Sequence, residues 1–214
     1  MEAVILCGGL GTRLRPVIGD SIPKCMAPVK GQPFLNYLFD FLIKNEVQRV
    51  VLATGHNNEP IHRYYGRDYK GMRISYSHER TTLGTGGALV SAMRYCKTDN
   101  IVVCNGDSLF YCDLVKMIVD HLERKSNITM AVTKNNHMEF KNPYLIDTYV
   151  NCGLYVIDKL VFRDFGVITS FSFENDFLPK YMNRDGNKIN AYYSEGYFID
   201  IGTPEDYKRA NKEL

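Results

Sequence analysis

Hydrophobic and polar residues follow two alternating patterns along the chain as far as residue 134. Apolar runs typical of buried strands cover 3–9, 49–55, 72–79, 100–107 and 128–134, and patterns of helical period cover 33–45, 86–96 and 113–126. Strands that alternate with helices favour a mostly parallel sheet, because each parallel connection crosses back over one face of the sheet. The pattern therefore predicts an α/β fold with helices on both faces of a central sheet.

Beyond residue 140 the pattern becomes mixed, so the sheet is expected to be mixed as well. Residues 148–158 and 189–202 have strand character, and 173–182 has helical character. Near the end of the chain, Thr203 can cap a helix, and Asp206 completes a capping box. No repeat, low-complexity stretch or linker interrupts the pattern, which predicts a single domain over residues 1–214.

Composition narrows the classes of protein that the chain can belong to. A hydrophobic content of 45% is enough for one full core, and the net charge of +2 provides no overall field for nucleic acid. We find no apolar run of the roughly 18 residues that a membrane span needs, and no signal-peptide pattern. The six cysteines form no CxxC pair, which is typical of free thiols in a reducing compartment. We therefore expect a cytoplasmic protein with no nucleic-acid or membrane partner.

A glycine-rich turn directly follows the first apolar run, and it reads Cys7-Gly8-Gly9-Leu10-Gly11-Thr12-Arg13-Leu14. Glycines at a strand-to-helix turn let backbone N–H groups approach phosphate oxygens, and a guanidinium adds forked donors that match them. Lys24 adds a second cation downstream. The glycine spacing fits neither the dinucleotide fingerprint nor the P-loop. We predict a phosphate site that uses Gly8, Gly9, Gly11 and Arg13, with Leu6 and Thr12 flanking it.

Two aspartates end apolar runs that are far apart in the sequence. Asp107 follows residues 101–104, and Asp200 follows 197–199. Ligands of open α/β sheets gather at the carboxyl ends of strands, and two carboxylates with phosphate oxygens and waters make an ordinary octahedral magnesium site. A lone aspartate at such a place is more often part of a turn. Together with the phosphate loop, Asp107 and Asp200 predict a Mg²⁺ site.

The glycine turn and four later motifs occur in the order found in the sugar-1-phosphate nucleotidyltransferases, which the chain resembles over nearly its whole length. The later motifs are Gly84-Thr85-Gly86-Gly87-Ala88, Asn105-Gly106-Asp107, Val150-Asn151-Cys152-Gly153-Leu154-Tyr155 and Phe198-Ile199-Asp200-Ile201-Gly202. The resemblance implies a Rossmann-like nucleotidyltransferase fold. It also implies transfer of a nucleoside monophosphate from a nucleoside triphosphate to a sugar 1-phosphate, with release of pyrophosphate.

Within that family the chain is most similar to guanylyltransferases that act on heptose or mannose 1-phosphates, which implies GTP and a heptose 1-phosphate as substrates. Two other interpretations stay open. The enzyme could use another base, or another acceptor such as a mannose, glucose or amino-sugar phosphate or a small phosphorylated compound. Alternatively, the chain could be a regulatory subunit that binds nucleotide sugars without turnover. The tyrosine-rich C-terminal segments, with Tyr192, Tyr193 and Tyr197, either pack in the core, which we favour, or form the seam of a homodimer.

The resemblance also assigns roles to single residues. It makes Arg13, Lys24 and Asp107 catalytic, with Asp107 and Asp200 as metal ligands. The nucleobase would lie against the small residues of the loop, among them Gly84 and Thr85, with Gly106 nearby. The sugar would contact Asn151, Gly153 and Glu174, although a glutamate such as Glu174 is also typical of a helix's first turn.

Two further residues are candidates for binding the base and the sugar phosphate. Glu79 could accept hydrogen bonds from N1–H and N2–H of guanine, but it could equally be a solvated charge at the end of a strand. The family's usual Glu-Lys pair before the sugar motif is missing here. Lys141 is the nearest cation, and we expect it to bind the sugar phosphate.

Overall fold

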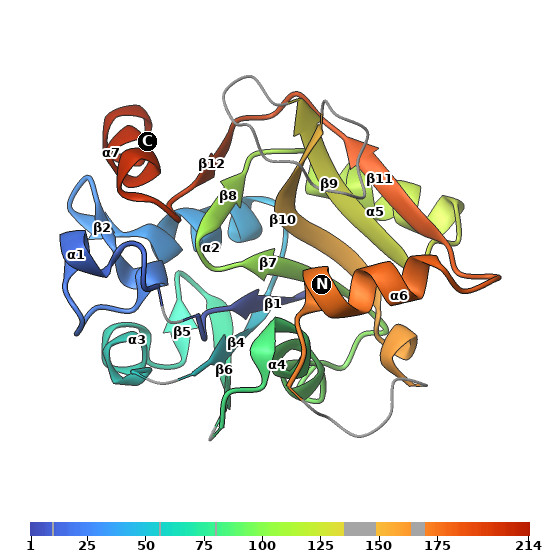
Figure 1. Ribbon diagram of the computed structural model, residues 1–214, viewed down its shortest axis with the longest axis horizontal. Helices are drawn as coiled ribbons and strands as arrows, with labels where there is room; N and C mark the ends of the chain where they lie inside the picture. The colour runs from blue at the N-terminus through green and yellow to red at the C-terminus, as the bar shows by residue number, and fades with distance from the viewer. Residues whose placement is uncertain (10, 56, 80, 135–148, 164–169) are drawn as a thin grey trace.

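A computed structural model describes residues 1–9, 11–55, 57–79, 81–134, 149–163 and 170–214. Among these residues, eight strands form one sheet in the order β11-β9-β10-β7-β1-β4-β6-β5 (Figure 1). Neighbours are parallel except that β10 runs antiparallel to both β7 and β9, and β5 to β6. The strands are β1 (Glu2–Leu6), β4 (Arg49–Thr54), β5 (Asp68–Tyr69), β6 (Met72–His78), β7 (Asn100–Asn105), β9 (Ile128–Lys134), β10 (Tyr149–Asp158) and β11 (Ile189–Tyr193).

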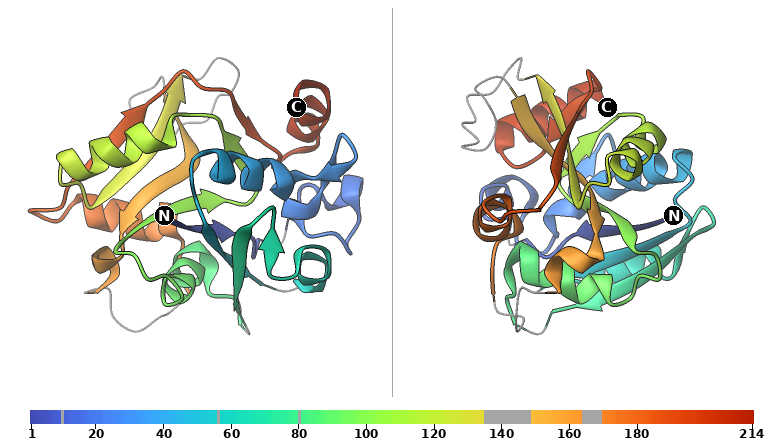
Figure 2. Two further views of the ribbon diagram at one scale, coloured as in Figure 1. Left: turned by 180° about the vertical axis from the view of Figure 1, so that it is seen from behind. Right: turned by 90° about the vertical axis from the view of Figure 1, so that its right-hand side faces the viewer.

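Helices cover both faces of this sheet, as Figure 2 shows from two further directions. One face packs against α2 (Phe34–Lys44), α3 (Glu59–Tyr65), α5 (Leu114–Glu123) and α7 (Pro204–Glu213). The other face packs against α4 (Gly84–Met93), a π-helical turn (Phe173–Phe177) and α6 (Leu178–Met182). The shorter pieces are α1 (Arg15–Ile18), β2 (Pro28–Val29), β3 (Gln32–Pro33), β8 (Ser108–Phe110), β12 (Phe198–Asp200) and the 3-10 turns Lys24–Met26 and Lys159–Phe162.

The sequence pattern follows from this two-sided burial. On β1, Ala3 and Ile5 belong to one buried cluster, and Val4 between them belongs to the other. Successive side chains of a strand point to opposite faces, so a strand that is covered on both sides is apolar throughout. The predicted α/β class and the mixed, mostly parallel sheet are confirmed. No helix within the described ranges is long and apolar enough to span a membrane.

The strand predicted over 189–202 is wrong as a single element. Residues up to Tyr193 form β11, which pairs with β9 at the edge of the large sheet, whereas β12 pairs with β8 in a separate two-stranded sheet. Between the two strands the backbone at Gly196 passes close to the backbone of Tyr111. Glycine has no Cβ atom, and one added to Gly196 would lie 1.8 Å from the Tyr111 carbonyl oxygen, so a larger residue does not fit there. The predicted helix over 173–182 is likewise divided, because its first part is the π-helical turn.

Register brings the ends of the parallel strands to one edge of the sheet. Leu6 is opposite both Ala53 on β4 and Asn105 on β7, and Thr54 is opposite His78 on β6. The segments that follow β1, β4, β6 and β7 therefore start side by side. The glycine turn after β1 and the acidic residue after β7 are neighbours for this reason.

Candidate active site

Two adjoining cavities lie at this edge and share a wall. We call the first the loop cavity, of about 250 Å³, lined by Leu6, Gly8, Gly9, Glu79, Thr82, Gly84, Thr85, Ala88, Asn105, Asp107, Phe173 and Glu174. We call the second the carboxylate cavity, of about 320 Å³, lined by Arg13, Asn105, Asp107, Ser108, Val150, Asn151, Gly153, Glu174, Phe198, Asp200, Thr203 and Asp206. The shared residues are Asn105, Asp107 and Glu174. A ligand that spans both cavities would pass over these three side chains.

The glycine turn forms one end of the loop cavity. A Cβ on Gly8 would lie 3.1 Å from Glu79 Oε1 and 3.3 Å from the backbone nitrogen of Gly55, so the turn is packed closely against the next strand end. Gly11 has φ +61°, and a Cβ there would lie 3.1 Å from Lys24 Cβ. The turn thus needs glycine for its conformation at Gly11 and for its close approach at Gly8. Thr12 is exposed and lines neither cavity.

Asp107 and Asp200 meet in the carboxylate cavity. Ser108 Oγ lies 2.9 Å from Asp200 Oδ2 and 3.3 Å from Asp107 Oδ1. The pairing of β8 with β12 is what brings the second aspartate to the first, because Asp200 is the register partner of Ser108. The two residues that the sequence could place only separately therefore face the same small space.

Two cations reach the same place. Lys24 Nζ is ion-paired with Asp107 Oδ2, and its side chain is only 12% exposed. A Cβ on Gly202 would lie 3.2 Å from both Lys24 Nζ and Arg13 Nη2, and 2.5 Å from Asp200 Oδ1. Three of the four charged groups predicted from the sequence thus lie beside Gly202, whose own N–H donates to Asp200, and the fourth, Asp107, joins them through its ion pair with Lys24.

Burial raises the pKa of Asp200 to about 6, with the charge of Asp107 as the next cause, while Lys24, Ser108 and the Gly202 amide act in the opposite direction. Two carboxylates at one place repel each other, and a divalent cation would relieve that repulsion. The described residues contain no cluster of three or more His, Cys, Asp or Glu side chains suited to a metal. The donor set is therefore two carboxylates, which fits a hard cation that takes its other ligands from phosphates and water.

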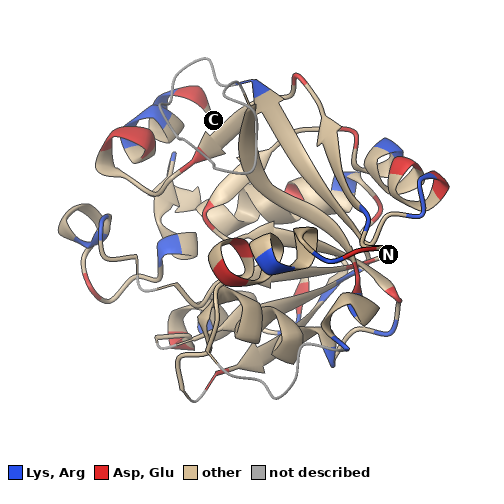
Figure 3. Ribbon diagram, turned by 45° about the vertical axis from the view of Figure 1, so that its right-hand side comes forward, with Lys and Arg blue, Asp and Glu red and all other residues tan. Residues whose placement is uncertain are grey.

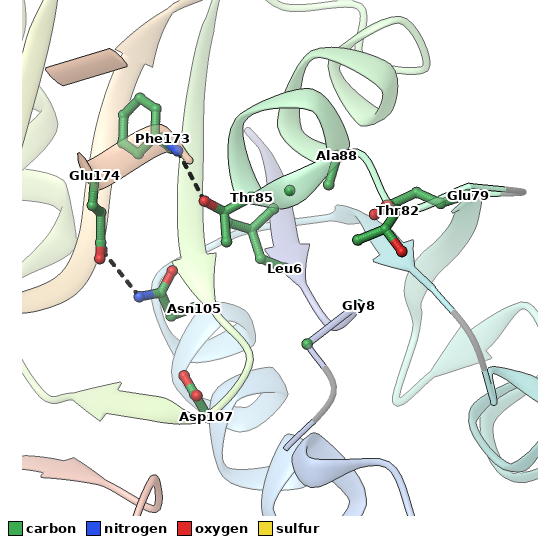
Figure 4. Close-up of a pocket in the computed structure, with 12 residues that line it drawn as sticks. Leu6, Gly8, Glu79, Thr82, Thr85, Ala88, Asn105, Asp107, Phe173 and Glu174 are labelled. Carbon is green, nitrogen blue, oxygen red and sulfur yellow. Dashed lines mark hydrogen bonds between the residues drawn. The ribbon is translucent and has the colours of Figure 1, made fainter. Parts of the chain in front are cut away.

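Glu79 lies at the far end of the loop cavity from Glu174 (Figure 4). Its Oε2 accepts the Leu83 N–H at 3.0 Å, and burial raises the pKa of its carboxyl, against the opposing effects of Leu83 and His78. The carboxylate is half-buried and held in place, so it is not the solvated strand-end charge that was one of its two interpretations. Its other oxygen lies beside Gly8.

Packing requires two small residues of the loop at the start of α4. A Cβ on Gly86 would lie 2.0 Å from the ring of Phe171, and a Cβ on Gly84 would lie 2.4 Å from the Phe171 carbonyl oxygen. Phe171 therefore occupies the space over Gly86. Thr85 uses its hydroxyl to accept the Phe173 N–H at 2.9 Å, although both Gly84 and Thr85 still line the loop cavity.

Three residues of β10 line the carboxylate cavity, namely Val150, Asn151 and Gly153. The register between β10 and β9 shifts between Asn151 and Tyr155, and Gly153 inside this bulge has φ +66°. A Cβ on Gly153 would lie 2.8 Å from Asn105 Nδ2, which itself donates to Glu174 Oε1 at 3.3 Å. Asn151 and Glu174 therefore face one cavity although one comes from a strand and the other from the π-helical turn, whose acidic start is visible in Figure 3.

The structure brings together nearly all the residues singled out from the sequence. Gly106 lines neither cavity. It packs against the end of β1, where a Cβ would be 2.7 Å from the Leu6 carbonyl oxygen. Lys141 lies outside the described residues. Other lining residues had no role assigned from the sequence. Some of them belong to the quoted motifs, namely Ala88, Asn105, Val150 and Phe198, and the others are Thr82, Ser108, Phe173, Thr203 and Asp206. Asn105 opens a motif that was noticed, whereas Thr203 and Asp206 carry only the pattern of a helix cap.

Comparison with known proteins identifies the class of protein that this fold and site define. Residues 2–144 match the family model described as Nucleotidyl transferase. The chain belongs to that family, as its motifs predicted.

Two curated relatives match over the full length. The chain is 41% identical to "D-glycero-alpha-D-manno-heptose 1-phosphate guanylyltransferase" of Aneurinibacillus thermoaerophilus, over 100% of this chain and 98% of the relative. It is 37% identical to the protein of the same name from Campylobacter jejuni, over 97% of each chain. The crystal structure of HddC from Yersinia pseudotuberculosis complexed with GMP-PN is similar in fold, with a TM-score of 0.84 and 32% identity over 99% of this chain and 98% of that one.

Proposed function

We propose that the protein transfers the guanylyl group of GTP to D-glycero-alpha-D-manno-heptose 1-phosphate, forming the GDP-sugar and releasing pyrophosphate. The observation that carries the proposal is the gathering of Asp107, Asp200, Lys24 and Arg13 where the two cavities join. Full-length similarity to guanylyltransferases of that substrate supports the choice of base and sugar. The free state of all six cysteines suits a reducing compartment, and we place the reaction in the cytoplasm.

The reaction would be a direct displacement at the α-phosphorus. An oxygen of the sugar phosphate is already an anion near neutral pH, so no general base is required, and the enzyme's task is to bring two anions into line. In the proposed arrangement the triphosphate lies along the glycine turn, with the amides of Gly8, Gly9 and Gly11 toward its oxygens. Arg13 stabilises the charge that develops on the leaving pyrophosphate, and Lys24 bridges donor and acceptor phosphates.

Asp107 and Asp200 would hold Mg²⁺, which when bound supplies positive charge to the phosphate oxygens. In this arrangement Lys24 leaves Asp107 and turns to the phosphates. That exchange would keep Asp107 paired with a cation both before and after the substrates bind.

The base and the sugar would take opposite ends of the joined cavities. Glu79 is an acceptor-only group fixed beside the glycine turn, and guanine presents two adjacent N–H donors that suit it. Asn151 and Glu174, at the other end, present an amide and a carboxylate to the vicinal hydroxyls of the sugar, with Gly153 leaving room for the ring. Lys141 is proposed to neutralise the sugar phosphate.

A panel of substrates tests the proposal. Each of GTP, ATP, UTP, CTP and dTTP is combined with the 1-phosphates of D-glycero-D-manno-heptose, mannose, glucose and N-acetylglucosamine, and pyrophosphate release is measured with and without Mg²⁺. We expect the highest kcat/KM for GTP with the heptose phosphate, and no release in EDTA. A higher kcat/KM for another pair would overturn the substrate assignment. Binding of GDP-heptose in calorimetry without turnover of any pair would instead support the regulatory-subunit interpretation.

A further inference from the structure

Tyr155 is a fully buried residue that touches both proposed sugar-binding side chains. Its exposed fraction is 0%, and its ring packs edge-on against Phe173, the residue before Glu174, at 5.2 Å between ring centroids. Its hydroxyl donates to Glu174 Oε1 at 2.5 Å and accepts from Asn151 Nδ2 at 2.6 Å. One phenol oxygen therefore joins the amide on β10 to the carboxylate on the π-helical turn.

The bulge in β10 makes this contact possible. Residues four apart on a regular strand are about 13 Å apart along it, because each residue rises about 3.3 Å. In β10, Asn151 is opposite Val132 and Tyr155 is opposite Met130, so four steps on one strand match two on the other. The two extra residues form a bulge at Gly153, which has a positive φ. The Gly153 N–H donates a hydrogen bond of 3.0 Å to Asn151 Oδ1. The bulge thus turns Asn151 back toward the tyrosine of its own strand.

The hydrogen bonds leave particular atoms available to a ligand. Glu174 Oε1 takes the bonds from Tyr155 and from Asn105 Nδ2, and neither of them uses Oε2. The Asn151 side-chain oxygen accepts from the Gly153 N–H, and its amide nitrogen donates one hydrogen to Tyr155. Neither bond uses the second amide hydrogen. An acceptor and a donor are thereby held at one wall of the cavity, which is the pair that two neighbouring hydroxyls of a sugar require.

We propose that Tyr155 is a positioning residue, which fixes the Glu174 carboxylate and the Asn151 amide so that they bind vicinal hydroxyls of the sugar 1-phosphate. This inference rests on the function proposed above. Burial, and secondarily the charge of Glu174, raises the pKa of Tyr155 well above its ordinary value, so the phenol keeps its proton and remains the donor to Glu174. The phenol reaches the substrate only through its two partners.

The test is Tyr155→Phe, which keeps the ring and its packing on Phe173 and removes the hydroxyl. We expect the KM for the sugar 1-phosphate to rise roughly tenfold, because a charged hydrogen bond is lost and two binding groups are released. The KM for GTP should change by less than about twofold, since Glu79 and the glycine turn are untouched. In a Glu174→Ala background, Tyr155→Phe should raise the KM for the sugar by less than about twofold, because its main partner is already gone.

Tyr65→Phe is the matched control. Tyr65 is also buried, at 6% exposure, and its hydroxyl donates to the side-chain oxygen of Asn36 at 2.7 Å, away from both cavities. Both variants should lose thermal stability, but Tyr65→Phe should leave both KM values unchanged. A KM for the sugar that is unchanged in folded Tyr155→Phe, or a KM for GTP that rises equally, would overturn the positioning role.

If Tyr155→Phe did not fold, a crystal structure of the wild-type enzyme with the sugar 1-phosphate would decide. The proposal requires Tyr155 bonded to Glu174 and Glu174 bonded to a sugar hydroxyl, and a Glu174 carboxylate turned away from either one contradicts it. Failure of the proposed function is a different result, because the wild-type enzyme would then release no pyrophosphate with any sugar 1-phosphate. An active wild-type enzyme with an unaffected Tyr155→Phe variant refutes the positioning role alone.

Discussion

The loop cavity and the carboxylate cavity adjoin each other but are built in different ways. The loop cavity is lined by small residues of the glycine turn and of the start of α4, at the ends of β1, β6 and β7, where parallel register aligns the strands. The carboxylate cavity is formed by polar side chains from β8, β10, β12 and the π-helical turn, joined by hydrogen bonds. The difference indicates that steric changes will disturb the loop cavity most, whereas polar changes that conserve shape will disturb the carboxylate cavity most.

The largest effect is expected at the shared wall. Asp107→Asn should lower kcat by roughly a hundredfold or more, because the change removes a charge stabiliser common to both cavities. Pyrophosphate release under saturating substrates measures it. Asp113→Asn is the control, since Asp113 caps α5 through Lys116 N–H and asparagine caps equally well, so its kcat should match wild type. Turnover of Asp107→Asn near the wild-type rate would contradict the catalytic role proposed for Asp107.

A smaller effect is expected at the base end of the loop cavity. Glu79→Gln keeps an oxygen for the Leu83 N–H but places an NH₂ group where guanine would donate. We expect kcat/KM for GTP to fall roughly tenfold or more, which corresponds to the loss of one charged hydrogen bond, with little change for UTP. Competition between the two triphosphates measures this discrimination. An equal fall for both triphosphates would mean that Glu79 only holds the loop.

A substitution in α4 tests the expectation that steric changes disturb the loop cavity. Gly→Ala inside a helix ordinarily stabilises by about 0.5–1 kcal/mol, but at Gly86 the new methyl group would strike the Phe171 ring, with atoms at 2.0 to 2.7 Å. Gly86→Ala should instead destabilise by about 1–3 kcal/mol and raise the KM for GTP a fewfold. Chemical denaturation measures the stability. Gly86→Ala with Phe171→Leu should recover part of the loss, and no recovery would place the strain elsewhere.

The last test concerns stability and pH at Asp200. Its folded pKa of about 6 lies above its ordinary value of 3.8, so its protonated form stabilises the folded protein at low pH, and that stabilisation is lost as the pH rises from about 4 to about 6. In EDTA, Asp200→Asn should therefore unfold at a higher temperature than wild type near pH 7, and the difference should shrink toward pH 4. Thermal scans measure it. A difference that is the same at both pH values would show that Asp200 titrates normally.

The loop cavity is also the part that sequence analysis described well. Each of its strand ends follows an apolar run, and the glycines of the turn show directly where the backbone needs an unusual conformation or close approach. Parallel register then aligns the ends without further information. The role of Gly86 was the exception, because its partner Phe171 lies far along the chain, and nothing in the local pattern shows which group occupies the space above a glycine.

The alternation of strands and helices, the glycine turn and the strand-end position of Asp107 can all be derived from the amino-acid sequence, because periodicity and glycine spacing are local properties. The pairing of β12 with β8, which brings Asp200 to Asp107, is visible only in the folded chain. The same is true of the bulge in β10 that turns Asn151 toward Tyr155 and Glu174. These arrangements depend on contacts between distant segments, whose free energies are set by packing and burial rather than by any residue's neighbours in the chain.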